Sequence, residues 1–199
     1  MISFTMMAQQ PVTPDYSKDL TQIKFGLKGG VNFSTQNFGS EINGSSLDLN
    51  STSLTAAHFG LFAEVPISEK LMFKPEALYS VEGSDINIFV TQFQQKFTFI
   101  KVPLLASYRI GNNLSLQGGP QFGFLIDETL DVEDDSVDIL DSSFKKFEFS
   151  MAIGLEYDLS ESLLLGARYN IGVSDISNTQ EASLRTNNLQ VYVGWRLFK

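Results

Sequence analysis

The residues of this chain that could do chemistry include a single histidine, His58, which would serve as a general base if a hydroxyl nucleophile lay beside it. Ser34 is the hydroxyl that the sequence pattern places most plausibly near His58. No GxSxG or HExxH motif and no phosphate-binding glycine loop accompanies the pair. We therefore interpret His58 as a hydrogen-bonded side chain and expect no catalysis.

A second candidate is the acidic segment DETLDVEDDSVDILD, residues 127–141. Its carboxylates could hold Ca²⁺, which takes about six to eight oxygen ligands. The spacing lacks the DxDxDG turn of an EF-hand, so a solvated acidic loop is the favoured interpretation. The ligands of the weaker metal-binding alternative would be Asp131, Glu133, Asp134, Asp135 and Asp138. Beyond this weak candidate, the sequence predicts no metal site and no cofactor.

The remaining charged residues mostly alternate with apolar ones, and this alternation defines the elements that must position them. In IKFGLKGGVNF, residues 23–33, the odd positions are mostly apolar and the even positions are polar or glycine. A period of two residues indicates a β-strand. The same pattern predicts eight strands, at residues 23–33, 57–67, 71–81, 100–110, 114–126, 147–157, 163–171 and 189–197.

The connections between these strands alternate in length. Residues 68–70, 111–113 and 159–162 form short turns, whereas residues 36–54, 83–96, 128–145 and 174–187 form long loops. An even number of antiparallel strands with this alternation is typical of an outer-membrane barrel. We therefore predict an all-β fold, an eight-stranded antiparallel up-and-down transmembrane β-barrel with short periplasmic turns and long extracellular loops. Four prolines within strands predict β-bulges, at Pro66, Pro75, Pro103 and Pro120.

The polar face of the strands is rich in glycine, which is unfavourable in a strand unless neighbouring side chains need the space. The interior of an eight-stranded barrel is narrow enough to create that need. On the apolar face, aromatic residues near the strand ends predict two membrane-interface girdles. These residues are Tyr79, Tyr108, Tyr157, Tyr169 and Trp195. We predict that the polar face lines a lumen and the apolar face contacts lipid; a soluble ligand-binding barrel is the alternative.

Charged residues of both signs would then lie in the lumen, where an unpaired charge is costly. They are Lys24, Lys28, Glu64, Lys74, Glu76, Glu82, Lys101, Arg109, Glu148, Glu156, Arg168 and Arg196. The favoured interpretation is a salt-bridge network that fills the barrel. A narrow ion path or a gated pore is the alternative.

Composition limits the partners and the organisation of the chain. The net charge of -9 argues against nucleic acid, and the absence of cysteine removes disulfides and thiolate chemistry. No apolar run reaches the length of a membrane-spanning helix. We expect a signal-peptide remnant at residues 1–8, a polar lead-in at 9–21 and one barrel domain at 22–199.

Several segments resemble a known family in their order and spacing. They include FGLKGGVNFS, FKPEALYSVEG, IKVPLLASYRI, LQGGPQFGFLI, AIGLEYDLSESLLLGARYNIGVSDI and VYVGWRLF. The chain resembles the PorT-like outer-membrane barrel domain family of Bacteroidota, one of the small barrels similar to OmpA and OmpX. The resemblance implies a bacterial outer-membrane location and an eight-stranded barrel, and it implies little about function.

These observations favour a monomeric structural or surface-interaction protein without catalysis. Its expected partners are outer-membrane lipid and lipopolysaccharide, with a surface protein or ligand at the long loops; a divalent cation at the acidic loop could bridge to lipopolysaccharide phosphates. A narrow passive channel is the first alternative. A membrane-embedded acyl-transfer enzyme that uses His58 and a soluble ligand-binding barrel are weaker ones.

Overall fold

The computed structural model describes residues 22–39, 41–42, 45–46, 51–88, 91–132, 135–138, 147–174 and 183–197. The expected signal-peptide remnant at residues 1–8 and the polar lead-in at 9–21 lie outside these residues. No helix within the described ranges is both long and apolar enough to cross a membrane.

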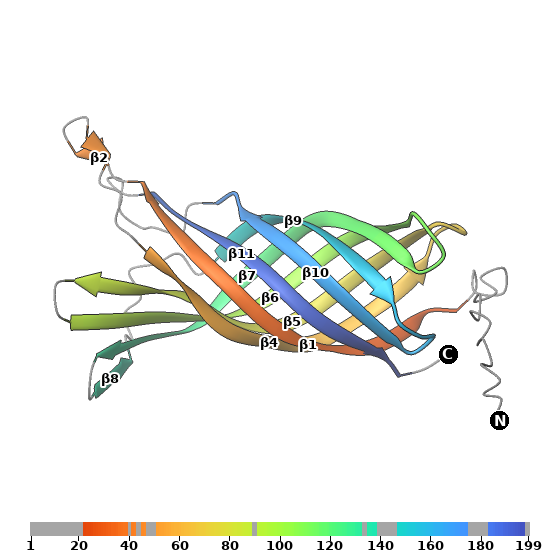
Figure 1. The fold of residues 1–199 in the computed structure, drawn as a ribbon, viewed down its shortest axis with the longest axis horizontal. Helices are drawn as coiled ribbons and strands as arrows, with labels where there is room; N and C mark the ends of the chain where they lie inside the picture. Colours follow the sequence, from red (N-terminus) through yellow and green to blue (C-terminus); the bar gives the residue numbers. More distant parts are fainter. Residues whose placement is uncertain are drawn as a thin grey trace, which may run out of the picture.

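Eight long strands form the wall of the molecule (Figure 1). They are β1 (Lys24–Gly39), β4 (Ser51–Pro66), β5 (Leu71–Ile88), β6 (Thr91–Arg109), β7 (Leu114–Val132), β9 (Phe147–Asp158), β10 (Leu163–Gly172) and β11 (Ser183–Arg196). Short strands β2 (Glu41–Ile42) and β3 (Ser45–Ser46) pair with each other, and β8 (Asp135–Asp138) pairs with the end of β7.

The sheet closes on itself because every long strand pairs with two neighbours. Each strand pairs antiparallel with the long strand before and after it in the sequence, and β1 pairs with β11 to complete the ring. The pairing of β1 with β11 runs from Gly26↔Arg196 to Gly39↔Ser183, which is almost the whole length of β1. The predicted eight-stranded antiparallel up-and-down barrel is therefore confirmed.

Three tight connections lie at one end of the barrel, which we call the turn end; the opposite end is the loop end. In the first turn, the backbone amide of Ile67 donates to the carbonyl oxygen of Leu71 at 2.9 Å, and Leu159 donates to Leu163 in the same way in the third. The hydroxyl of Ser68 also accepts a bond from the amide of Leu71 at 3.2 Å. Strand β1 begins and β11 ends at this same end (Figure 1).

One predicted long loop is mostly strand. Residues 83–96 were expected to form a loop, but β5 and β6 continue as a hairpin that extends beyond the barrel at the loop end (Figure 1). Their register runs from Gly83↔Lys96 through Ile86↔Phe93 to Ile88↔Thr91. The segment carries isoleucine and phenylalanine, which favour strands, and cross-strand pairing satisfies its backbone hydrogen bonds.

The prediction of β-bulges at the strand prolines is wrong. The pairing of β7 with β9 continues in one register through Pro120↔Met151, and the register of β5 with β6 is the same on both sides of Pro75. A proline lacks one donor, which removes a hydrogen bond but does not require an extra residue. The register shifts instead between Ser53 and His58 and between Thr98 and Phe99.

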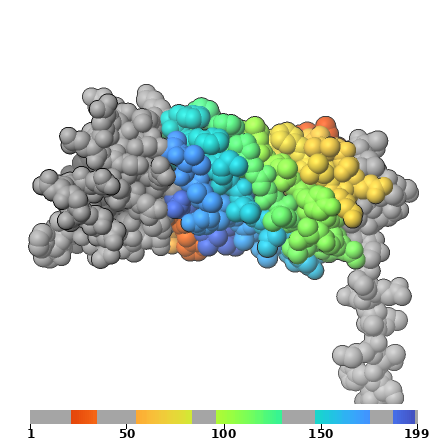
Figure 2. Space-filling model, turned by 90° about the horizontal axis from the view of Figure 1, so that it is seen from above, coloured from red at the N-terminus to blue at the C-terminus, as the bar shows by residue number. Residues whose placement is uncertain are grey.

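The distribution of burial is the reverse of that in a water-soluble protein. Lys74, Lys101 and Arg168 are each 1% exposed, whereas Leu61 is 57% and Trp195 is 61% exposed. Figure 2 shows one side of the barrel, where side chains from successive strands form a continuous wall. An apolar exterior around a polar interior is stable only if lipid, not water, surrounds the wall.

Glycine makes the interior fit its larger side chains. A Cβ added at Gly166 would lie 2.3 Å from the ring of Tyr192, and one at Gly26 would lie 2.3 Å from the ring of Phe62. Phe62, Leu164 and Tyr192 form the small apolar cluster inside the barrel. The glycines of the lumen face therefore provide the space that these bulky groups occupy.

Candidate functional site

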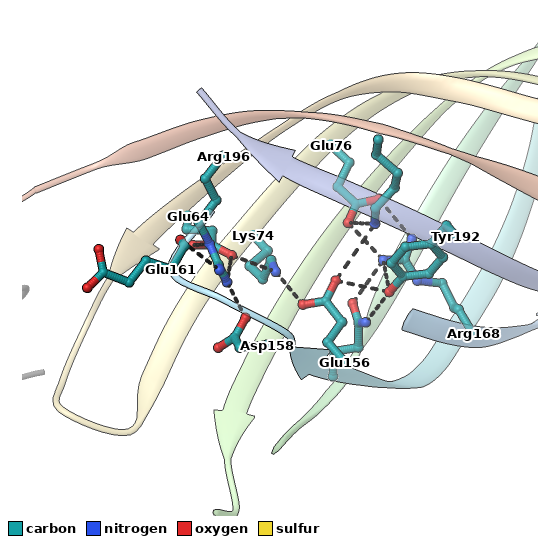
Figure 3. Close-up of polar contacts among 11 residues, drawn as sticks. Glu64, Lys74, Glu76, Glu156, Asp158, Glu161, Arg168, Tyr192 and Arg196 are labelled. Carbon is teal, nitrogen blue, oxygen red and sulfur yellow. Dashed lines mark hydrogen bonds and ion pairs between the residues drawn. The ribbon is translucent and has the colours of Figure 1, made fainter. Parts of the chain in front are cut away.

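The lumen near the turn end contains ion pairs that link strands from opposite sides of the barrel (Figure 3). Lys74 Nζ lies 2.9 Å from Glu64 Oε1 and also forms an ion pair with Glu156. Arg196 Nε donates to Glu64 Oε2 at 2.8 Å, and its Nη2 donates to Asp158 Oδ1 at 2.6 Å. These contacts tie β4, β5, β9 and β11 together.

A second group of contacts continues this network toward the middle of the barrel (Figure 3). Both Nη atoms of Arg168 donate to the carboxylate of Glu76 at 2.8 Å, the two-bond geometry in which guanidinium and carboxylate pair most strongly. Lys28 Nζ lies 2.6 Å from Glu76 Oε1 and 3.8 Å from the centre of the Tyr192 ring. The Tyr192 hydroxyl donates to Glu156 at 3.0 Å.

We call these connected residues the turn-half cluster. Its charged members are Lys28, Lys74, Arg168 and Arg196, opposed by Glu64, Glu76, Glu156 and Asp158. Positive and negative charges are equal in number, so the cluster is neutral although it is buried. Neutrality and multiple hydrogen bonds are the conditions under which buried charges are tolerated.

A separate group lies nearer the loop end, and we call it the loop-half cluster. It consists of Glu82, Lys101 and Glu148. Lys101 Nζ lies 2.8 Å from Glu148 Oε1 and 3.2 Å from Glu82 Oε2. Asn188 Nδ2 donates to Glu82 Oε1 at 2.8 Å, and the Ser80 hydroxyl donates to the same oxygen at 3.0 Å.

The structure thus brings ten of the twelve charged residues predicted for the lumen into two clusters. The other two, Lys24 and Arg109, are half-buried at the turn end, where Arg109 Nη1 donates to the carbonyl oxygen of Glu69 at 3.4 Å. Sequence reasoning missed Asp158 and Tyr192 as network members. Both lie on the lumen face by the same alternation that identified Glu156, so the strand pattern itself was the available signal.

The structure does not assemble the candidate pair of His58 and Ser34. The Ser34 hydroxyl donates to the carbonyl oxygen of Gly83 at 2.9 Å and accepts from its amide at 3.0 Å. His58 is buried against the edge of Tyr192, with ring centres 6.2 Å apart, and neither ring nitrogen has a hydrogen-bond partner in the described part of the chain. The hydrogen-bonded histidine expected from the sequence is therefore not what the structure shows.

The aromatic residues predicted to form girdles all point outward and are substantially exposed. Tyr108, Tyr157 and Trp195 pair with residues that directly follow the tight turns. Tyr79 stacks on Phe59 of β4, with ring centres 5.1 Å apart. The members of this set are Tyr79, Tyr108, Tyr157, Tyr169 and Trp195. Their role at the membrane interface remains a prediction.

The candidate acidic metal site lies mostly outside the described residues. Glu133 and Asp134 are not described, and only the backbone is described at Asp131, Asp135 and Asp138, in the hairpin of β7 and β8. Elsewhere in the described chain, no group of three or more histidine and acidic side chains is placed to hold a metal ion.

Comparisons with known proteins agree with this architecture. The model of the outer membrane protein beta-barrel domain family matches residues 7–178. Ail, the attachment invasion locus protein of Yersinia pestis, is 14% identical with a TM-score of 0.50 over 87% of this chain and 98% of that chain. Neisserial surface protein A is 12% identical with a TM-score of 0.53 over 87% of this chain and 97% of that chain. No curated protein matches the sequence.

Proposed function

This chain belongs to the outer membrane protein beta-barrel domain family, and we propose that it is a structural or surface-interaction protein whose filled lumen neither conducts ions nor catalyses a reaction. Its location is the bacterial outer membrane. Within this family, the motifs of the sequence favour the PorT-like group. The observation that carries the proposal is the packing of the lumen by large side chains and closed ion pairs.

Large side chains fill the lumen where the turn-half cluster meets the apolar cluster. Phe62 and Tyr192 lie within 6 Å of the Lys28 ammonium, at 5.9 Å and 3.8 Å between that nitrogen and the ring centres. Leu164 is fully buried beside these rings. Arg168 is 1% exposed and holds Glu76 through two hydrogen bonds. Such tight pairing leaves the charges unavailable to a passing ion.

Conductance in planar lipid bilayers tests this proposal against the passive channel. We expect no resolved current steps from the purified wild-type barrel. The matched comparison is the double variant Phe62→Ala and Leu164→Ala, which removes two of the three members of the apolar cluster and leaves every charge in place. We expect this variant to conduct. Steady current steps from the wild type would reject the closed lumen and favour the passive channel.

The proposed absence of catalysis is supported by the lack of a hydrogen bond between His58 and Ser34: neither ring nitrogen of His58 has a partner among the described residues, and the Ser34 hydroxyl bonds to Gly83. We expect His58→Ala to leave the acylation of lipid and lipopolysaccharide in the host membrane unchanged when the barrel folds normally. A loss of lipid or lipopolysaccharide acylation in that variant, with barrel yield intact, would favour the acyl-transfer alternative.

The interaction surface is proposed to lie at the loop end, because long connections tolerate sequence change and carry binding residues in many folds. Ail has been crystallised with the heparin analogue sucrose octasulfate, which is a polyanion. This chain has a net charge of -9 and an acidic segment at residues 127–141, so we propose a cationic partner, or lipopolysaccharide phosphates bridged by divalent cations.

Sidedness follows from loop length, since short turns face the periplasm in barrels of this type. The chain contains no cysteine, so a single cysteine can be introduced without competing thiols. In intact cells, an impermeant maleimide should label Asp135→Cys in β8 and spare Asn112→Cys in a tight turn. Labelling of Asn112→Cys alone would invert the proposed orientation. Crosslinking through Asp135→Cys would then identify a surface partner.

A further inference from the structure

The two charge clusters of the lumen differ in their balance. The turn-half cluster contains as many basic as acidic side chains. The loop-half cluster contains one basic side chain, Lys101, and two acidic ones, Glu82 and Glu148. With all three residues ionised, it carries one excess negative charge. Because all three are at most 3% exposed, bulk solvent does little to stabilise that charge.

Lys101 is already fully engaged. Its ammonium group is shared between the two carboxylates and also lies 4.2 Å from the centre of the Phe99 ring. Glu82 accepts hydrogen bonds through both oxygens. Glu148 accepts only through Oε1, and its buried Oε2 has no hydrogen-bond partner in the part of the chain that the structure describes. The unbalanced charge is therefore concentrated on the Glu148 side of the cluster.

Polar side chains beside this cluster also have unpaired atoms. Asn188, which donates to Glu82, has an unpaired Oδ1. Asn170 pairs with Asn188 in the register of β10 and β11, and both of its side-chain polar atoms are unpaired. Gln190 follows Asn188 on the same face of β11, is 0% exposed and has both polar atoms unpaired. Leaving so many buried polar atoms unpaired would offset much of the stability of a folded domain.

We propose that the loop-half cluster, together with Asn170, Asn188 and Gln190, forms a binding site for one small monovalent cation. The unpaired atoms are mainly oxygens, on Glu148, Asn170, Asn188 and Gln190, with two amide nitrogens among them. Oxygen atoms are the ligands that hard cations prefer. One positive charge balances the cluster, and water bound with the cation would satisfy the amide nitrogens.

The charge of the site selects against a divalent ion. Such an ion would reverse the excess charge of the cluster and would be repelled by Lys101 at the same carboxylates. It also prefers several carboxylate ligands, whereas no group of three or more acidic or histidine side chains is placed to hold a metal in the described chain. The expected guests are therefore alkali cations or ammonium. This inference does not depend on the proposed surface role.

Binding can be measured directly by equilibrium dialysis of the folded full-length barrel against radioactive Rb⁺, a probe for alkali cations. We expect saturable binding of one Rb⁺ per barrel, displaced by K⁺ and not by N-methylglucamine. Glu148→Gln makes the cluster neutral and should weaken binding at least about tenfold. The matched control, Glu69→Gln in an exposed turn, should bind Rb⁺ as the wild type does.

Unfolding of the wild type provides a second readout that needs no variant. At matched ionic strength, the urea midpoint should be higher in rubidium chloride than in N-methylglucamine chloride, because a ligand that binds only the folded state stabilises it. Equal midpoints, together with no saturable Rb⁺ binding, would overturn the proposal. Stability that rises on acidification but is the same in both salts would mean that a proton, not a cation, neutralises the cluster.

Discussion

Glu76 offers the sharpest test of the idea that the lumen charges are isolated from water. Its side chain accepts hydrogen bonds from Lys28 Nζ at 2.6 Å and from both Nη atoms of Arg168 at 2.8 Å. Glu76→Gln retains the shape of the side chain, removes its charge and leaves the turn-half cluster with one excess positive charge. The amide group also replaces one acceptor with a donor, which opposes the two cationic donors.

We expect Glu76→Gln to lower the free energy of unfolding by about 3 to 5 kcal/mol, the usual effect of removing one partner from a buried ion pair. The matched control is Glu69→Gln, which makes the same chemical change in an exposed turn. It should alter the free energy of unfolding by less than about 0.5 kcal/mol. Comparing the two variants distinguishes the effect of removing a buried charge from the effect of losing a carboxylate group at any position.

The assay is urea unfolding of the barrel in lipid vesicles, followed by the fluorescence of Trp195. This residue is the single tryptophan of the chain and lies on the outer face. The double variant Glu76→Gln and Lys28→Gln restores neutrality, so it should be less destabilised than the sum of the two single variants, by about 0.5 to 3 kcal/mol. A loss below about 1 kcal/mol in Glu76→Gln, with additive effects in the double variant, would show that water screens these charges and would refute the reasoning.

Two further pairs of variants test the wall of the barrel. Leu61→Arg should lower the free energy of unfolding by about 2 to 4 kcal/mol, because Leu61 is on the outer face in the middle of its strand. Ile67→Arg, at a similarly exposed position in the turn, should lower it by at most about 1 kcal/mol. Equal losses would exclude a band of lipid around the wall. Gly30→Ala should destabilise by about 1 to 3 kcal/mol because its Cβ would lie 2.1 Å from a backbone oxygen. The Cβ of Gly29→Ala would lie no nearer than 3.9 Å to another atom, so this variant should be tolerated. Similar urea midpoints for the two alanine variants would contradict the close packing around Gly30.

The sequence by itself determined which residues face the lumen and which face outward. Alternation of side chains is a local property of an extended chain, so the position of Lys28 between Leu27 and Gly29 was enough to assign its face. A short turn can only join strands that lie side by side and run antiparallel, so the short turns identified neighbouring strands. An even number of amphipathic strands can avoid exposed sheet edges by closing into a barrel. The buried position of Arg168 and the exposed position of Trp195 followed from these local rules.

The extent of the strands at the loop end could not be determined locally. In residues 83–96 the strands pair with each other in a hairpin that extends beyond the barrel (Figure 1), so a pattern set by the barrel wall does not predict how far they continue. Proline at positions 75 and 120 was also a poor guide, since the loss of one donor can be accommodated without a change of register.

Only the tertiary structure decided which charges meet. Arg196 bonds to Glu64 across 132 residues of sequence, and Arg168 bonds to Glu76 across 92. The alternation of side chains along each strand places all four in the lumen. Their heights along the barrel axis, however, depend on the tilt and stagger of the strands around the whole ring. The separation of the lumen charges into a neutral cluster and an unbalanced one depends on those heights, so no reading of single strands could have found it.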